Sequence, residues 1–92
     1  MLNRKNKVLK VTGKVHGVFF RATAYELAMK LALKGFVMNQ LDGSVLIEAE
    51  GTEEQLNQLI VWCKRGPKHA TVTEVIIVDG EIKAYTDFQI RR

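Results

Sequence analysis

The sequence predicts an α+β domain in which an antiparallel sheet carries two helices on one face. Three observations predict this class: short runs of strand-forming residues, two helical patterns that separate them, and a total length of 92 residues. A chain of this length suits one domain and is too short for two. We therefore expect residues 1–92 to form a single domain.

The first part of the chain predicts a strand, a loop and a helix. Residues 7–12 are rich in β-branched side chains and are followed by Gly13, a pattern typical of a strand end. After a loop at residues 13–20, apolar residues recur at the helical spacing i, i+3, i+4 and i+7. These residues are Ala24, Leu27, Ala28 and Leu31. Gly35 stands where a glycine that ends a helix is expected.

Residues 36–39 and 45–49 are predicted to form two further strands that pair as a hairpin. The dipeptide Asp42-Gly43 between them favours a tight turn. Because side chains alternate along a strand, the second strand has one apolar face, formed by Val45, Ile47 and Ala49. The opposite face carries Ser44, Leu46, Glu48 and Glu50.

A capping box predicts the start of a second helix, because Thr52 is followed three residues later by Gln55. Its apolar stripe consists of Leu56, Leu59, Ile60 and Cys63, and the helix is expected to stop at Gly66-Pro67. Strands at 71–78 and 84–90 follow. This order is that of a ferredoxin-like βαββαβ sandwich, with an antiparallel sheet and both helices on one face. The scaffold hosts many unrelated functions, so it decides nothing about activity.

Composition is that of an ordinary soluble domain, with 47% hydrophobic and 26% charged residues. No apolar run approaches the roughly 18 residues that span a membrane, so we expect no membrane contact. The N-terminus is basic but lacks the apolar segment of a signal peptide. The lone Cys63 cannot form an internal disulfide, which suits a reducing compartment. We therefore expect a cytoplasmic protein. The net charge of +4 is concentrated near the two ends and is typical of solvated tails.

Residues 13–21, with the sequence GKVHGVFFR, run from a predicted strand end into a predicted helix start. Two glycines allow a tight turn, and successive N–H groups can form an anion-binding nest beside the positive end of the helix. Arg21 can add a planar fork of donors over a bound anion. The segment is neither a Walker loop nor a dinucleotide fingerprint.

This segment closely resembles the signature of the acylphosphatase family, in which glycine-x-valine-glutamine-glycine-valine-x-phenylalanine-arginine is the pattern. The stretch 35–51, with the sequence GFVMNQLDGSVLIEAEG, resembles the second signature of the same family. Gly66-Pro67 and residues 88–90 are also similar, so the resemblance covers nearly the whole chain. The sequence departs from the pattern at a few positions: His16 replaces the usual glutamine, Met38 replaces a frequent basic residue, and Ala22 and Thr23 are uncommon choices.

The resemblance implies a hydrolase that cleaves the carboxyl-phosphate bond of acyl phosphates to a carboxylate and inorganic phosphate. It implies that Arg21 binds the substrate phosphate and that Asn39 orients the attacking water. The loop backbone would hold the remaining phosphate oxygens, through Val15, His16, Gly17, Val18, Phe19 and Phe20. It also implies a monomer that acts on small-molecule substrates.

The expected chemistry needs no cofactor and no metal. The carboxylate leaving group has a conjugate acid with a pKa near that of glutamate, about 4.3, so no general acid is required. Phosphoryl transfer depends mainly on positioning and charge stabilisation. Two histidines and one cysteine, with no carboxylate cluster at ligand spacing, predict no metal site.

Several other candidate residues have a simpler structural interpretation. We expect His16 to face solvent or to cap an amide, His69 to lie on the surface, and Cys63 to belong to the core. Glu48 and Glu50 share a strand face and could act as paired acids, but solvated or ion-paired carboxylates are favoured. Packing in the core and loops, rather than ligand contact, is expected for Phe19, Phe20 and Phe36.

Two rival functions remain open at this point. RNA-recognition domains share this fold class, and residues 34–37 faintly resemble the start of their central motif, but residues 45–49 carry no stacking aromatics. We therefore expect no nucleic-acid partner. The other rival is an accessory domain such as the N-terminal part of hydrogenase-maturation carbamoyltransferases. The chain's length favours a stand-alone enzyme.

Overall fold

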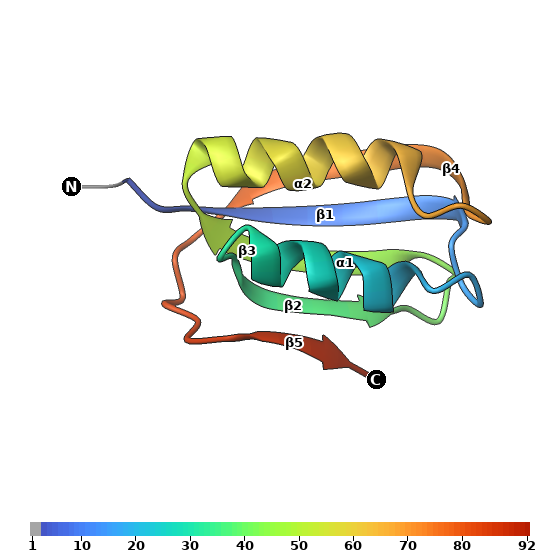
Figure 1. Ribbon diagram of the computed structural model, residues 1–92, viewed down its shortest axis with the longest axis horizontal. Helices are drawn as coiled ribbons and strands as arrows, with labels where there is room; N and C mark the ends of the chain where they lie inside the picture. The colour runs from blue at the N-terminus through green and yellow to red at the C-terminus, as the bar shows by residue number, and fades with distance from the viewer. Residues whose placement is uncertain (1–2) are drawn as a thin grey trace.

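The computed structural model describes residues 3–92 and has two helices packed on one face of a five-stranded sheet (Figure 1). Residues 1–2 of the predicted domain lie outside the described part. Among the described residues, no helix is long and apolar enough to cross a membrane. The elements follow in the order β1 (Lys5–Lys14), α1 (Phe20–Lys30), β2 (Lys34–Asn39), β3 (Val45–Gly51), α2 (Glu53–Arg65), β4 (Thr71–Gly80) and β5 (Phe88–Arg91). The predicted ferredoxin-like order is thus confirmed.

The sheet has the strand order β4-β1-β3-β2-β5. The pairs β1·β3, β1·β4 and β2·β3 are antiparallel, as expected, but β5 pairs with β2 in parallel. The prediction of a purely antiparallel sheet is therefore wrong for the last strand. After β4, residues 81–87 cross the sheet at one end, as Figure 1 shows, so β5 must run opposite to β4. That direction is parallel to β2.

The core lies between the sheet and the two helices. Leu9 and Val11 of β1 and the predicted apolar face of β3 are fully buried against small residues of α1 and the apolar stripe of α2. The predicted capping box is present, because Thr52 accepts from the Gln55 N–H and Gln55 accepts from the Thr52 N–H. Cys63 is completely buried, and burial raises the pKa of its thiol to about 12. The expected core role of Cys63 is confirmed, and its thiol stays protonated.

Gly35 does not end the first helix, contrary to the sequence prediction. Helix α1 stops at Lys30, and Ala32 adopts the left-handed conformation that turns the chain (φ 59°). Gly35 lies inside β2 opposite Ala49, with φ 140°. A Cβ atom at this position would lie 1.9 Å from the carbonyl oxygen of Glu48. The glycine is therefore required for the close approach of β2 to β3.

Glu48 and Glu50 are buried on the sheet face away from the helices, where they bind the 81–87 connector. Lys83 Nζ donates to Glu48 at 2.6 Å, which confirms the ion-paired interpretation. The backbone N–H groups of Lys83 and Tyr85 donate to the two oxygens of Glu50 at 2.6 and 3.0 Å. Asn6 Nδ2 lies 2.9 Å from both carboxylates. These contacts fix the connector, and with it the start of β5.

The pKa values of both carboxyl groups are lower than usual. Burial on its own would raise the pKa of Glu50, but hydrogen bonds from Lys83, Asn6 and Tyr85 outweigh it. At Glu48, hydrogen bonds and the charge of Lys83 outweigh burial in the same way. A carboxylate whose pKa is lowered by folding stabilises the protein above its unfolded pKa, about 4.3 for a glutamate, and loses that contribution as the pH falls further.

We predict that Glu50→Gln lowers the free energy of unfolding at pH 7 by about 1–3 kcal/mol. The amide nitrogen of the glutamine would face an N–H group that now donates a hydrogen bond to the carboxylate. Wild type should lose stability below about pH 4.3, and the variant should lose less over that range. Urea unfolding at pH 7 and at lower pH measures both effects. Glu53→Gln is the matched control, since Glu53 forms only an exposed pair with Lys5. Equal losses in the two variants would contradict the assigned role of Glu50.

Candidate active site

The loop between β1 and α1 has a backbone conformation suited to anion binding. A bulge between Thr12 and Gly13 shifts the register of β1 against β4, and the pairing then continues to Lys14 opposite Thr71. In the loop, Gly17 (φ 71°) and Phe19 (φ 63°) have left-handed conformations, whereas His16 and Val18 do not have positive φ. Alternating handedness of this kind turns successive N–H groups toward one concave side. A left-handed phenylalanine costs roughly 1–2 kcal/mol, and such strain concentrates at functional sites.

The backbone donors of this loop are unused by the protein. Within residues 3–92, no hydrogen bond is donated by the backbone N–H of any residue from Val15 to Ala22. The last three of these groups belong to the first turn of α1, which has no side-chain cap. The positive end of the helix dipole therefore adds to a continuous row of free donors.

The segment that carries these donors borders a hollow of about 440 Å³. Its lining joins three parts of the chain: the loop and start of α1, the end of β2, and the end of β5. The lining residues are Val15, Gly17, Phe19, Phe20, Arg21, Ala22, Asn39, Ile90 and Arg92. The structure thus brings together Arg21 and Asn39, as the sequence predicted, and leaves the side chains of His16 and Val18 outside the lining.

Arg21 and Asn39 both reach the hollow with unused hydrogen-bonding capacity. Arg21 is half-buried as a residue, and its guanidinium makes no hydrogen bond or ion pair with another described residue. Asn39 Oδ1 is buried and has no hydrogen-bond partner among residues 3–92. A buried acceptor without a partner costs about 1–3 kcal/mol, so it favours a ligand that donates to it.

Sequence reasoning did not predict that three further residues line the hollow, namely Ala22, Ile90 and Arg92. The parallel pairing of β5 with β2 places Ile90 beside Val37 and Arg91 beside Met38. One further step in this register places Arg92 next to Asn39. The sequence held no signal for this neighbour, because β5 was expected to be antiparallel.

Phe19 has a different environment from the one predicted. Phe20 is buried and packs on Trp62 with ring centroids 5.0 Å apart, and Phe36 is also buried. Phe19, in contrast, is 78% exposed and lies at the edge of the hollow.

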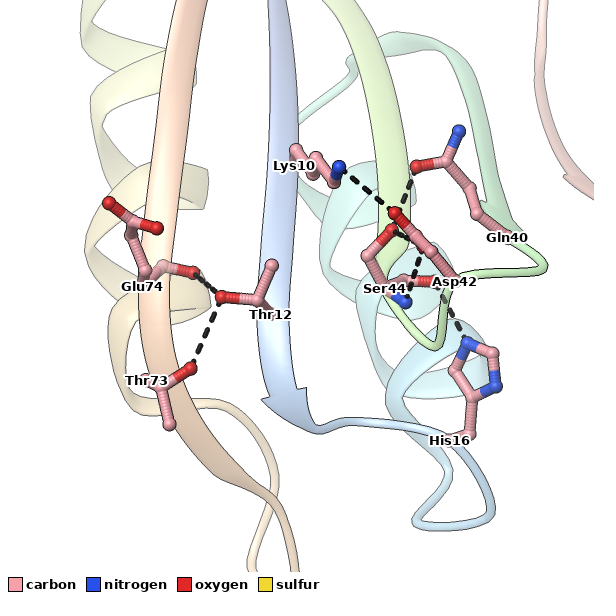
Figure 2. A network of polar contacts seen from close by, with 8 residues as sticks. All are labelled: Lys10, Thr12, His16, Gln40, Asp42, Ser44, Thr73 and Glu74. Atoms are coloured by element: carbon pink, nitrogen blue, oxygen red, sulfur yellow. Dashed lines mark hydrogen bonds and ion pairs between the residues drawn. The ribbon is translucent and has the colours of Figure 1, made fainter.

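His16 connects the loop between β1 and α1, which we call the anion loop, to the β2–β3 hairpin, as Figure 2 shows. The residue is exposed, as predicted, but it does not cap an amide. Its Nε2 lies 2.8 Å from the Ser44 carbonyl oxygen. Since a carbonyl only accepts, Nε2 is the protonated nitrogen. His69 is exposed on the α2–β4 loop, as predicted.

The hairpin loop at residues 40–44 is held by its own polar contacts (Figure 2). Asp42 Oδ1 accepts from the Ser44 hydroxyl and the Ser44 N–H at 2.5 and 3.0 Å, and Asp42 Oδ2 pairs with Lys10 of β1 at 2.9 Å. These hydrogen bonds and Lys10 hold the pKa of Asp42 well below its usual range. The carboxylate that organises the loop therefore stays charged at any physiological pH.

A second, larger hollow of about 850 Å³ lies on the outer face of the helices. Leu27 of α1 and residues of α2 form its lining, and none of the predicted site residues contacts it. Among residues 3–92, no group of three or more histidine, cysteine, aspartate or glutamate side chains is arranged to hold a metal ion.

Comparison with known proteins relates this site to one family. The family model described as Acylphosphatase matches residues 7–90. A relative from Synechococcus sp. (strain WH7803), named acylphosphatase, is 49% identical over 81 residues, which are 88% of this chain and 81% of the relative. The structure of an acylphosphatase from Coxiella burnetii superposes with a TM-score of 0.93 at 35% identity, covering 97% of this chain and 94% of that chain.

The rival accessory-domain interpretation also has a structural counterpart. Full-length HypF, in a phosphate- and nucleotide-bound form, matches the whole of this chain with a TM-score of 0.90 at 28% identity, but the match covers only 12% of that protein. The acylphosphatases, in contrast, are matched over most of their length. With the family model spanning residues 7–90 and these relatives, the chain belongs to the acylphosphatase family.

Proposed function

We propose that the hollow between the β1–α1 loop, β2 and β5 is the active site of an acyl phosphate hydrolase, with Arg21 and Asn39 as its catalytic residues. Membership of the acylphosphatase family assigns the activity, namely cleavage of an acyl phosphate to a carboxylate and inorganic phosphate. One observation carries the residue assignment. Among the described residues, the backbone N–H groups from Val15 to Ala22, the Arg21 guanidinium and the buried Asn39 Oδ1 have no polar partner, and the segment, Arg21 and Asn39 line the same hollow.

The phosphate of the substrate would bind to the donors. Loop N–H groups from Val15 to Phe20 supply fixed dipoles, and the first turn of α1 adds its positive end. Arg21 supplies a planar pair of donors that fits two phosphate oxygens. Because these groups are already in place, they can stabilise charge on the phosphoryl oxygens in the transition state without reorganisation.

Asn39 would hold the nucleophile. Its Oδ1 can only accept, so the molecule it binds must donate, as water does. A water that donates one proton to Oδ1 can direct a lone pair at the phosphorus atom. Asn39 cannot take a proton at neutral pH, so the water proton would pass to a phosphate oxygen as the P–O bond to the acyl group breaks.

The leaving group explains why so few residues suffice. A carboxylate departs without protonation, since its conjugate acid is as strong as a glutamic acid side chain. An alkoxide, in contrast, would need a proton from a general acid. The hollow is lined by two arginines, one asparagine and otherwise apolar or glycine residues, none of which is an acid of suitable strength.

We further propose that the protein is a single-domain cytoplasmic monomer without a nucleic-acid partner. The aromatic that could stack a base on the open sheet face, Phe36, is already covered by Arg91, whose guanidinium carbon lies 3.9 Å from the ring centroid, and by Tyr85 at its edge. Sedimentation velocity with and without RNA tests both the monomer and the missing partner.

We predict that inorganic phosphate binds in the loop. The free N–H groups there should show the largest amide shifts when the protein is titrated with phosphate and followed by NMR. Arg21→Ala should abolish the response, and His69→Ala, on the exposed α2–β4 loop and outside the lining of the hollow, should leave it intact. Shifts centred on the basic residues Arg4 and Lys5 instead would count against the site.

We predict that acetyl phosphate and benzoyl phosphate are hydrolysed and that alkyl phosphate monoesters are poor substrates, because the hollow offers no general acid. Hydrolysis should be unchanged by EDTA, since positioning by Arg21 and amides supplies the charge stabilisation. Comparable rates on the two phosphate classes, or activity that EDTA removes and a divalent ion restores, would show that an acid or a metal had been missed.

We predict that Arg21 and Asn39 have different kinetic signatures. Arg21 contacts phosphate in the ground state and the transition state, so Arg21→Ala should raise KM and lower kcat. Arg21→Lys should also fail, because an ammonium cannot reproduce the planar fork. Asn39→Ala should lower kcat by about 10²–10³ while phosphate inhibits at similar concentrations.

Steady-state kinetics with phosphate as the inhibitor measures these effects, and circular dichroism verifies that each variant is folded. A near-normal kcat for Asn39→Ala would overturn its role. So would a loss of phosphate inhibition as complete as that of Arg21→Ala.

A further inference from the structure

The anion loop has one polar connection to the rest of the fold. Within residues 3–92, residues 15–18 neither donate nor accept any hydrogen bond other than that of His16 Nε2 to the Ser44 carbonyl oxygen, at 2.8 Å. Val15 and Val18 are buried, so side-chain packing anchors the loop from below. Few contacts, however, fix the position of the loop N–H groups relative to the hairpin.

The partner of His16 is itself attached to Asn39. The same Ser44 carbonyl oxygen accepts the Gln40 N–H at 2.8 Å. That N–H belongs to the peptide bond that joins Asn39 to Gln40. A single carbonyl oxygen therefore holds both the His16 ring, as Figure 2 shows, and the backbone at the carboxyl side of Asn39.

This carbonyl is a rigid anchor. Ser44 is 2% exposed, and its hydroxyl oxygen lies 2.8 Å from Gln40 Oε1 and 2.5 Å from Asp42 Oδ1. Asp42 pairs in turn with Lys10 on β1, which lies between β4 and β3 in the sheet. Movement of His16 relative to Ser44 thus changes the distance between the loop donors and Asn39, not the shape of the hairpin.

We propose that His16 is a positioning residue that sets the distance between the phosphate-binding loop and the water-binding Asn39. This inference rests on the proposed roles of the loop and Asn39. Neither the imidazole nor Ser44 lines the hollow, so His16 acts through the carbonyl it shares with Gln40 and not by contact with substrate.

The proposal predicts a specific kinetic pattern. Phosphate alone needs only the loop and Arg21, whereas the transition state also needs Asn39 at the correct distance. Replacing His16 should therefore lower kcat and leave phosphate inhibition nearly unchanged. The loss of one hydrogen bond between positioned groups corresponds to about a tenfold decrease in kcat.

Two variants of similar length separate the hydrogen bond from side-chain bulk. His16→Gln retains a donor that can reach the Ser44 carbonyl, so it should keep kcat within about threefold of wild type. His16→Met has no donor and should lose about tenfold. His69→Ala, which removes the other, exposed histidine, is the control for general effects of histidine loss. Equal kcat values for the glutamine and methionine variants would overturn the proposal.

A double-mutant cycle tests whether His16 acts through Asn39. In the Asn39→Ala background, His16→Met should cause little further loss, since no water-binding group remains to be positioned. An unchanged tenfold loss in that background would show that His16 acts elsewhere and would overturn the proposal. Failure of the proposed function is distinguishable, because Asn39→Ala alone would then keep a normal kcat.

Nitrogen-15 NMR of the histidine ring supplies a readout that does not depend on activity. In the neutral imidazole, the hydrogen bond requires the one ring proton on Nε2. A larger Nε2–H fraction at His16 than at the exposed His69, which serves as the reference, would support the link. The Nδ1–H tautomer at His16 would overturn it.

Discussion

The proposed site depends on a row of backbone N–H groups, at the junction of β1 and α1, that have no acceptor among residues 3–92. Buried N–H groups elsewhere in a fold nearly always find partners, and a helix start is normally capped by a side chain. Here Phe19 precedes the helix in a left-handed conformation and offers no cap. The free donors are tolerable because their segment borders an open hollow, where a ligand can accept from them.

The strength of this arrangement comes from the packing below the loop. Val15, Val18 and Phe20 are buried, and Phe20 lies against Trp62 of α2. These three buried residues fix the loop to the core, while Gly17 and Phe19 between them take left-handed conformations. The strain at Phe19 is supported by the core contacts of its two neighbours.

The rest of the site comes from strand ends, and each is held by a polar group away from the hollow. Asp42 and Ser44 close the hairpin that follows Asn39. Glu48 and Glu50 hold the connector that starts β5, which brings Ile90 and Arg92 to the same hollow. Carboxylates that look like a catalytic pair in the sequence thus have a structural function, because Lys83 and two backbone N–H groups already occupy them.

The amino-acid sequence by itself determined the order of the elements and predicted that the 13–21 segment, Arg21 and Asn39 belong together, and all three border one hollow. Local patterns were sufficient for these features, since alternation in β3, the Thr52–Gln55 capping box and the 13–21 segment are each written in neighbouring residues. Only the tertiary structure decided the direction of β5, the partner of Gly35, the exposure of Phe19 and the contact between His16 and Ser44. Each of these depends on segments far apart in the chain: the connector crosses the sheet at one end, β2 approaches β3 too closely for a Cβ atom, and the anion loop reaches the hairpin. Spacing along a chain carries no record of such meetings, because they follow from how the packed elements share one core.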